Sequence, residues 1–357
     1  MVLIVCGAGW LSAFLKAPAL TPLLWWSIAM VVLLIPFNHY EVLLQAHYQF
    51  KKIFAAYVVR QGIQFAGIVV LYFAFPHYFT VLHLVWLQII ALLAGTIILF
   101  YATSPYRLRG YHHNGQIMLQ MFHFGKYIFG TNLFSHVARS LDHFVTANVL
   151  SPAAGKQYVA YYNVSARINN MIDVPTLATA DVLFPKNVET LETDGVGKVK
   201  YYFERILGTV LAVLLPVTLF IVLFPNFVVL VIAGKQYYYT DAALILQISI
   251  IGNLVRPLGY HFGSTLDALG KPRINFLTTT FLMTVSLVVT YFGLLYFGGR
   301  GAAYASLVFN IVSLVVMSAV MKKYIQLEPL NVLQYMIACY KDVFALLNKL
   351  RKTKTEH

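Results

Sequence analysis

Charged and amide side chains recur inside two long apolar segments, residues 125–150 and 156–184, which are long enough to cross a membrane as helices. A charged group at the centre of a membrane helix costs roughly 2.5–3.5 kcal/mol on insertion scales. A chain therefore keeps such groups mainly where they face one another, a water-filled cavity or a bound ligand. We call residues 125–186 the polar seam; its ionisable and amide residues include Arg139, Asp142, His143, Arg167, Asn170 and Asp173.

The polar residues of the seam follow helical spacing, and so do those of three further apolar segments. Steps of three and four residues place side chains on one face of a helix. The five stripes are Asn132, His136, Arg139 and Asp142; Asn163, Arg167, Asn170 and Asp173; Asn253, Arg256 and Tyr260; Asn38, Glu41 and Gln45; and Tyr57, Arg60 and Gln64. Five segments with one polar face each predict a shared aqueous cavity between helix bundles.

Four arginines lie inside these segments: Arg60, Arg139, Arg167 and Arg256. A guanidinium group stays charged and can donate two parallel hydrogen bonds to a phosphate. A wet cavity lined by such groups favours an anionic ligand that crosses the bilayer. We therefore expect the four arginines to contact the ligand and the amide, His136, Asp142, Asp173 and Tyr260 side chains to line the cavity.

Structural roles for some of these residues stay open. Arg139 and Asp142 are three residues apart and would neutralise each other within one helix. Arg60 would also extend along the helix towards the side of Lys51 and Lys52. Histidines such as His136 commonly form packed polar contacts. Glu41 is the only acidic residue of the first 103 residues, which makes it a candidate for binding a coupling cation or proton.

The composition is that of a polytopic membrane protein. Hydrophobic residues make up 59% of the 357 residues and charged residues only 11%, against about 25% in soluble proteins. The net charge of +13 is explained by cytoplasmic loops, so we expect no nucleic-acid partner. Cys6 and Cys339 lie far apart and show no metal-ligand spacing. No phosphate-binding loop, metal motif or nucleophile motif is present, so we expect no cofactor.

The apolar runs predict an all-α fold with about nine complete spans and a partial one at residues 2–15. The nine are residues 22–47, 53–75, 79–103, 125–150, 156–184, 206–225, 240–266, 274–297 and 301–322. With alternate loops assigned to opposite sides, 18 of the 26 Lys and Arg residues fall on one side, 4 on the other and 4 within spans. This bias predicts a cytoplasmic C-terminus.

Four regions follow from this pattern. Residues 1–103 form the remainder of an N-terminal helix bundle, 104–124 a cytoplasmic connector and 125–324 a six-helix bundle. Residues 325–357 form a cytoplasmic amphipathic and basic tail, expected to lie on the membrane surface. The loops are short on both sides, which leaves no room for a soluble catalytic domain.

Several sequence blocks resemble a known family. The stretch RSLDHFVTANVLSPAAGKQYVAYYNVSARINNMIDVP (139–175), followed by VLFPK (182–186), resembles the seventh and eighth helices of bacterial oligosaccharide flippases. LDALGKPRINFL (266–277), GGRGAAYASLVFNIVSLVVM (298–317) and LLQAHYQFKK (43–52) agree with further blocks in the right order. These are the polysaccharide-biosynthesis proteins (O-antigen and teichoic-acid export) of the multidrug/oligosaccharidyl-lipid/polysaccharide exporter superfamily.

The resemblance implies two six-helix bundles that open alternately to each side of the bacterial inner membrane. It implies transport, not catalysis, of an undecaprenyl-pyrophosphate-linked oligosaccharide to the periplasmic leaflet, with the arginines holding the pyrophosphate. Expected partners are this substrate, membrane lipids and the polymerase and glycosyltransferases of the same pathway. The chain starts where the family's third helix would end, so we expect an N-terminal truncation of about two helices.

Three alternatives stay open. The first is a cation-coupled exporter of drugs or metabolites on the same fold, which would rely on Glu41, Asp142 or Asp173. The second is a membrane-embedded glycan polymerase or glycosyltransferase, although the short loops offer no place for catalytic groups. The third is an inactive fragment.

Overall fold

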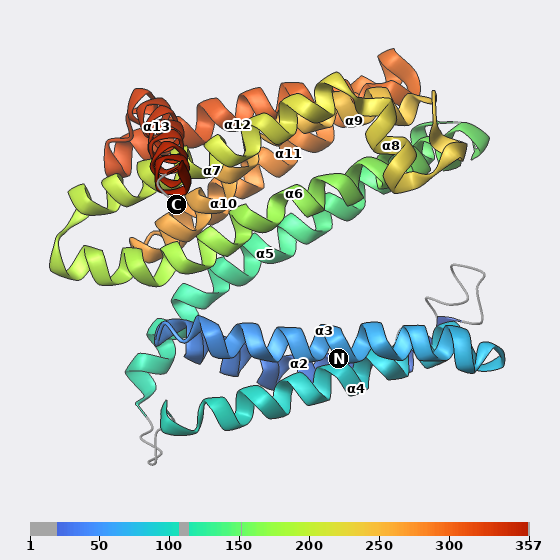
Figure 1. Cartoon of the computed structure of the whole chain (residues 1–357), viewed down its shortest axis with the longest axis horizontal. Helices are drawn as coiled ribbons and strands as arrows, with labels where there is room; N and C mark the ends of the chain where they lie inside the picture. Colours follow the sequence, from blue (N-terminus) through green and yellow to red (C-terminus); the bar gives the residue numbers. More distant parts are fainter. Residues whose placement is uncertain (1–19, 107–113, 151, 356–357) are drawn as a thin grey trace. The chain divides into compact units, whose positions relative to one another are not determined.

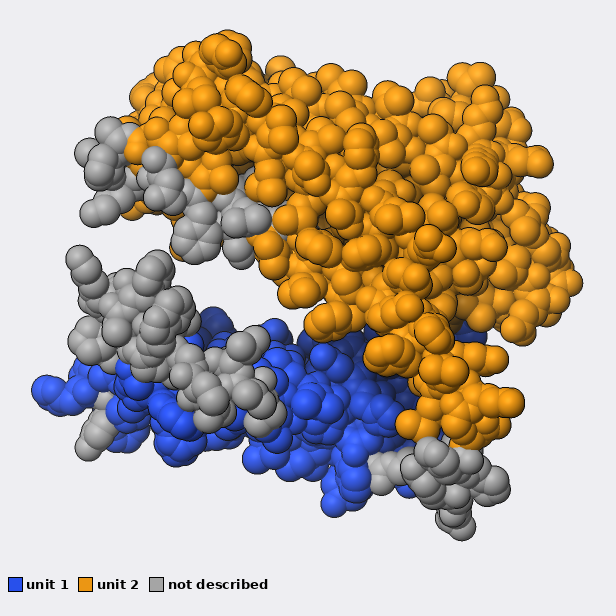
Figure 2. Space-filling view, turned by 180° about the vertical axis from the view of Figure 1, so that it is seen from behind, with its two compact units in different colours: residues 1–113 blue, residues 114–357 orange. Residues whose placement is uncertain are grey.

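The computed structural model describes residues 20–106, 114–150 and 152–355. All regular secondary structure in these ranges is helical. The chain divides into two compact units, residues 1–113 and 114–357, which Figures 1 and 2 show as ribbons and as a coloured surface. The predicted partial span at 2–15, together with Arg107 and Arg109, lies outside the described residues.

The first unit contains three long helices, α2 (Leu20–Ala46), α3 (Phe50–Ala74) and α4 (Val81–Ala102), and the short 3₁₀ turns η1 (Pro76–Tyr78) and η2 (Ser104–Tyr106). Helix α4 packs against both α2 and α3. Their common core consists of Phe37, Leu44, Ile53, Ala56, Leu92 and Leu99. Gly95 permits the close approach, because a Cβ atom there would lie 3.1 Å from the Phe37 ring.

The second unit contains the remaining helices. They are α5 (Gly115–Val149), α6 (Pro152–Thr193), α7 (Val196–Leu223), α8 (Pro225–Ala233), α9 (Asp241–Gly252), α10 (Arg256–Ala268), α11 (Pro272–Phe297), α12 (Gly301–Ile325) and α13 (Pro329–Thr355), with 3₁₀ turns η3 (Lys235–Tyr237) and η4 (Gly298–Arg300). Helix α11 packs between α5 and α12, and α6 packs along α9 and α10 (Figure 1). One apolar core forms between α6 and α9, and a second joins α7, α10, α12 and α13.

Within the described residues, five helical stretches are long and apolar enough to cross a membrane, or six if α9 and α10 form one span bent by 42°. One of the five, Pro272–Ile325, comprises both α11 and α12. Helices α5 and α6 have 35 and 42 residues but are not among the five, because the seam residues lower their hydropathy. The chain is thus a multi-pass helical membrane protein, and the predicted count of nine spans is not confirmed.

The C-terminal helix α13 is docked on α7. The buried carboxylate of Glu204, 2% exposed, accepts hydrogen bonds from the Glu328 backbone N–H (2.9 Å) and the Asn331 side chain (3.0 Å). The backbones approach closely at Gly208, where a Cβ atom would lie 2.7 Å from the Val332 carbonyl oxygen. Further along, the Tyr340 hydroxyl donates to the Ala212 carbonyl at 2.6 Å. Glu204 thereby satisfies donors at the start of α13 and fixes its position.

A surface ion pair adds to this contact. The ammonium group of Lys200 lies 2.5 Å from a carboxylate oxygen of Glu328. This hydrogen bond lowers the pKa of Glu328 below its ordinary value. The contribution of the pair is therefore present at neutral pH and is lost as the pH falls through the lowered pKa. Because Glu328 is exposed, we expect this contribution to be smaller than that of Glu204.

Replacing Glu204 by alanine is expected to loosen α13 from α7. Hydrogen bonds to a charged group contribute about 1.5–3 kcal/mol each, and the variant would lose the two that Glu204 accepts from the Glu328 N–H and the Asn331 amide. Hydrogen–deuterium exchange of the amides of residues 332–343 should therefore accelerate about tenfold or more. Glu192→Ala, which removes an exposed glutamate of α6, is the matched control and should leave exchange unchanged. Equal protection in both variants would contradict the anchoring role of Glu204.

Candidate functional site

Helix α6 presents two polar faces, not one. Asn163, Arg167 and Asn170 are exposed on the second unit. Asp173 lies on a different face, where its neighbours Ser165, Asn169 and Thr176 are buried. The predicted stripe of four residues therefore divides into an exposed group of three and a buried group that contains Asp173. The two groups have different surroundings and call for separate descriptions.

The buried face of α6 forms a line of polar contacts with α9 and α10. The Ser165 and Ser249 hydroxyls lie 2.5 Å apart, and the Asn169 amide donates to Ser249 at 3.3 Å. Asn253, at the end of α9, donates to the Asn169 side-chain oxygen at 2.9 Å. Farther along, the Asn187 amide donates to the Thr265 hydroxyl at 3.0 Å. Hydrogen bonds of this kind hold membrane helices together, so this line has a structural role.

Arg256 belongs to this line of contacts. Its guanidinium group, at the first residue of α10, forms an ion pair with the Asp173 carboxylate of α6. The Asp173 side chain is only 5% exposed, whereas 33% of the Arg256 side chain is exposed. A buried carboxylate is costly without a partner, and Arg256 provides one. The positive charge of Arg256 is thus balanced, which weakens the sequence-based expectation that it binds a ligand.

The exposed face of α6 borders a pocket. Arg167 and Asn163 line a cavity of about 360 Å³ together with residues of α8 and η3. The other lining residues are Ala160, Val164, Ile232, Ala233, Gln236 and Tyr237. Tyr237 is held in place by an edge-to-face contact with Tyr161 of α6, at 6.2 Å between ring centroids. No acidic residue lines the pocket, and none pairs with Arg167 within the described part of the chain.

The first unit contains its own polar cluster. The Tyr57 hydroxyl of α3 donates to the Glu41 carboxylate of α2, at 3.1 Å from each oxygen. The Arg60 guanidinium lies over the Phe37 ring at 5.1 Å and over the Tyr57 ring at 6.0 Å. The Nε atom of Arg60 is buried without a hydrogen-bond partner among the described residues. The structure thus gathers Glu41 and Arg60 around Tyr57, and their predicted roles in coupling and binding stay predictions.

The remaining residues predicted to form the site are dispersed. Asn132 and His136 are exposed on α5, and Tyr260 is half-buried on α10. The side chains of Arg139, Asp142 and His143 lie outside the described residues, so their pairing stays a prediction. Among the residues that are described, no three His, Cys, Asp or Glu side chains gather into a metal-binding group.

Sequence reasoning missed the buried polar line and two pocket residues. The sequence gives little indication that Ser165, Asn169 and Ser249 form contacts, because small polar residues are common throughout membrane helices. On α6, Ser165, Asn169 and Asp173 do follow steps of four residues, which a search for buried stripes would detect. Gln236 and Tyr237 of the pocket lie in the short η3 turn, which has no periodicity to read.

Comparison with known proteins identifies the family. Residues 1–241 match the model of the family described as polysaccharide biosynthesis protein. The chain belongs to this family. The family resemblance seen in the sequence is thereby confirmed. The match covers about two thirds of the chain, including the first unit, α5, α6 and the pocket that Arg167 lines.

A curated relative points in the same direction. The chain is 24% identical over 216 residues to a Shigella flexneri protein described as "Putative O-antigen transporter". This alignment covers 60% of the chain and 47% of that protein, so the chain spans about half the length of this relative.

Solved structures establish the fold. A crystal structure of a mutant MATE transporter of Vibrio cholerae superposes with a TM-score of 0.78 at 18% identity, covering 92% of this chain and 76% of that one. A MATE structure in the bent conformation gives 0.74 at 15% identity, covering 96% and 76%. A MOP superfamily transporter of Pyrococcus furiosus gives 0.63 at 16% identity, covering 75% and 62%. The chain therefore has the fold of these MATE and MOP superfamily transporters.

Proposed function

We propose that the protein moves an undecaprenyl-pyrophosphate-linked oligosaccharide from the cytoplasmic to the periplasmic leaflet of the bacterial inner membrane. The family, the description of the Shigella relative and the exporter fold support a role in exporting a surface polysaccharide. In this proposal the C-terminus is cytoplasmic, and a polymerase and glycosyltransferases of the same pathway act before and after transport.

The observation that carries the proposal is the environment of Arg167. Its guanidinium group is exposed, lines a pocket with amide and phenol groups, and has no acidic partner in the described residues. An unbalanced arginine in a membrane helix is costly unless an anion completes the site. A pyrophosphate supplies that anion, because the planar guanidinium donates two parallel hydrogen bonds to it. The neighbouring amide and tyrosine groups match the hydroxyl groups of a sugar.

Alternating access would then follow from movement of the helix bundles around a fixed site. The sugars would occupy the aqueous volume, while the polyprenyl tail would stay in the bilayer. Arg60 and Arg139 are proposed as further contacts for the pyrophosphate, and Arg256 as a weaker one because Asp173 already balances it. The amides of Asn132, Asn163 and Asn170 would contribute to the polar lining.

A cation-coupled exporter of small molecules is the second candidate. It needs a carboxylate that can take up and release a cation or a proton. Asp173 is paired with Arg256, which leaves it poorly suited to that task. Glu41 accepts a hydrogen bond from Tyr57 and is the better candidate on the described part of the chain. The balance of charges therefore favours the anionic substrate.

Replacing Arg167 by alanine is expected to lower the rate of leaflet translocation about tenfold or more, which corresponds to about 1.4 kcal/mol or more. The measurement uses proteoliposomes with labelled undecaprenyl-pyrophosphate oligosaccharide and a membrane-impermeant glycosidase that attacks only the outer leaflet. Arg167→Lys keeps the positive charge but lacks the planar guanidinium group. Its translocation rate should lie between the rates of the original protein and of Arg167→Ala.

The control is Lys186→Ala, which removes an exposed cation from the same helix, one that is paired with Glu189. It should translocate at the original rate, and all variants should elute and melt alike. An Arg167→Ala rate within twofold of the original would overturn the role of Arg167. If translocation were also lost in Glu41→Gln and required a sodium or proton gradient, the cation-coupled mechanism would be favoured instead.

A further inference from the structure

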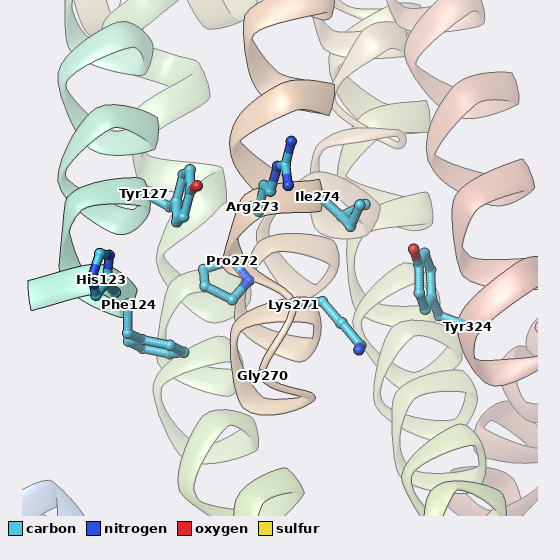
Figure 3. Close-up of a pocket in the computed structure, with 9 residues that line it drawn as sticks. All are labelled: His123, Phe124, Tyr127, Gly270, Lys271, Pro272, Arg273, Ile274 and Tyr324. Atoms are coloured by element: carbon cyan, nitrogen blue, oxygen red, sulfur yellow. The ribbon is translucent and has the colours of Figure 1, made fainter. Parts of the chain in front are cut away.

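A second groove lies in the second unit, on elements different from those that form the Arg167 pocket. Figure 3 shows its walls: α5 on one side, the turn between α10 and α11 in the middle, and α12 on the other side. The groove has a volume of about 440 Å³. Its lining residues are His123, Phe124, Tyr127, Gly270, Lys271, Pro272, Arg273, Ile274 and Tyr324.

The central turn is held in a fixed conformation. Gly270 has a φ of +69°, a left-handed value that side-chain-bearing residues rarely adopt. The Lys271 N–H donates to the Leu266 carbonyl at 2.8 Å, which closes the end of α10. Pro272 then opens α11, where its fixed φ suits the first helical position. Lys271 and Arg273 therefore project from a rigid support.

The groove is cationic. Lys271 and Arg273 are both exposed, and none of the nine lining residues is acidic. The nearby acid Asp267, at the end of α10, accepts hydrogen bonds from the Asn275 amide at 3.1 and 3.3 Å and does not line the groove. Two further cations lie next to lining residues of the groove. The Lys126 ammonium lies 3.1 Å from the His123 Nδ1 atom, and the Lys323 ammonium lies 5.9 Å from the Tyr324 ring centroid.

Some other cations of the same unit are already balanced by an acidic side chain. Lys186, Lys200 and Arg300 each form an ion pair with an acidic side chain. Lys271 and Arg273 form no such pair in the described part of the chain. Tyrosine and phenylalanine rings flank them, and Figure 3 shows Lys271 directed towards Tyr324. Cations interleaved with aromatic rings are typical of groups at the level of lipid headgroups.

We propose that this groove binds the phosphate group of an anionic lipid headgroup at the cytoplasmic surface of the membrane. Arg273 supplies a planar pair of donors and Lys271 a point charge. The Tyr127 and Tyr324 hydroxyls add neutral donors, and Phe124 and Ile274 offer apolar contact for the glycerol or first acyl carbons. Phosphate of this kind occurs both in anionic phospholipids and in a polyprenyl pyrophosphate, and the chemistry of the groove fits either source.

The test is thermal unfolding of the full chain in neutral detergent, titrated with phosphatidylglycerol, phosphatidylcholine or undecaprenyl pyrophosphate. Phosphatidylglycerol is expected to raise the melting temperature, and phosphatidylcholine is not. In Lys271→Ala/Arg273→Ala the titration midpoint should shift at least about tenfold to higher lipid concentration. The control Lys186→Ala/Lys198→Ala removes two other cations of this unit and should respond like the original protein.

The outcomes separate the two sources. If only undecaprenyl pyrophosphate raises the melting temperature, and Lys271→Ala/Arg273→Ala loses this increase, the groove is assigned to the carrier lipid. A response to phosphatidylglycerol assigns it to membrane phospholipid. Phosphorus analysis of delipidated protein provides a second readout, since the groove variant should retain less lipid phosphate than the control. Equal responses of the groove variant and the control to both anionic lipids would overturn the proposal, whatever the result for Arg167.

Discussion

Replacing Arg256 by methionine is expected to lower the free energy of unfolding by about 3 kcal/mol. The guanidinium group balances Asp173, whose side chain is 5% exposed, and methionine would leave that carboxylate buried without its cation. Asp173→Leu should cost less, because the Arg256 side chain is one-third exposed and can be hydrated. Chemical or thermal unfolding in detergent measures both changes.

The double variant Asp173→Leu/Arg256→Met decides between a structural and a ligand-binding role. Removing both members of a buried pair is often close to neutral, so the double variant should recover most of the lost stability. The matched control is the exposed pair Lys186–Glu189, whose removal should change stability by less than about 1 kcal/mol. If Arg256→Met melted like the original protein and only translocation fell, Arg256 would act on the ligand instead.

The Asp173–Arg256 pair also shows which part of the site the sequence pattern could predict. Steps of three and four residues placed Asp173 in one stripe with Asn163, Arg167 and Asn170. At about 100° per residue, Asn163, Arg167 and Asn170 lie within about 60° of each other, whereas Asp173 lies a further 60° away. Two successive steps of three accumulate this drift. The division of the stripe was therefore readable from the spacing, but the partner was not, because Arg256 is 83 residues away.

The helices themselves were largely predictable. The expected segments at 274–297 and 301–322 correspond to α11 and α12 within a few residues, because long apolar runs end at glycine or proline. The break between α9 and α10 was not foreseen, although Gly252 ends α9 and Pro257 is the second residue of α10, which are both signals of a helix boundary. Which helices cross the membrane is harder to predict, because the polar candidate site residues of α5 and α6 lower the hydropathy of these two helices.

The glycine-rich block GGRGAA, part of the family resemblance, has a packing explanation. It forms the tight connection between α11 and α12. Gly298 has a φ of +60°, and Gly299 lies against the ring of Tyr158. At Gly301 the backbones of the two helices meet: an added Cβ atom would lie 2.0 Å from the Gly293 carbonyl oxygen. The groove lies at the other end of both helices, where α11 begins and α12 carries Tyr324, so this contact fixes the two helices at the end away from the groove.

Gly301→Ala is therefore expected to destabilise the protein by about 3 kcal/mol, near the upper end of the cost of overpacking. The atoms in the way belong to the backbone at Gly293, which cannot rotate aside as a side chain does. Gly259→Ala is the control within the same unit: its new methyl group would meet only the Met317 side chain at 3.7 Å. There the higher helix propensity of alanine should leave stability unchanged or raise it by up to about 1 kcal/mol.

A second control separates the effect of a short distance to the added Cβ atom from the effect of rigid obstructing atoms. At Gly67 an added Cβ atom would lie 2.3 Å from Leu87, which is nearly as close as the contact at Gly301. The obstructing atoms there are the terminal methyl groups of a flexible side chain, which can adopt another rotamer. Gly67→Ala should thus cost much less than Gly301→Ala in the same thermal unfolding measurement. If the two variants lost equal stability, the close backbone contact between α11 and α12 would not be what requires glycine at position 301.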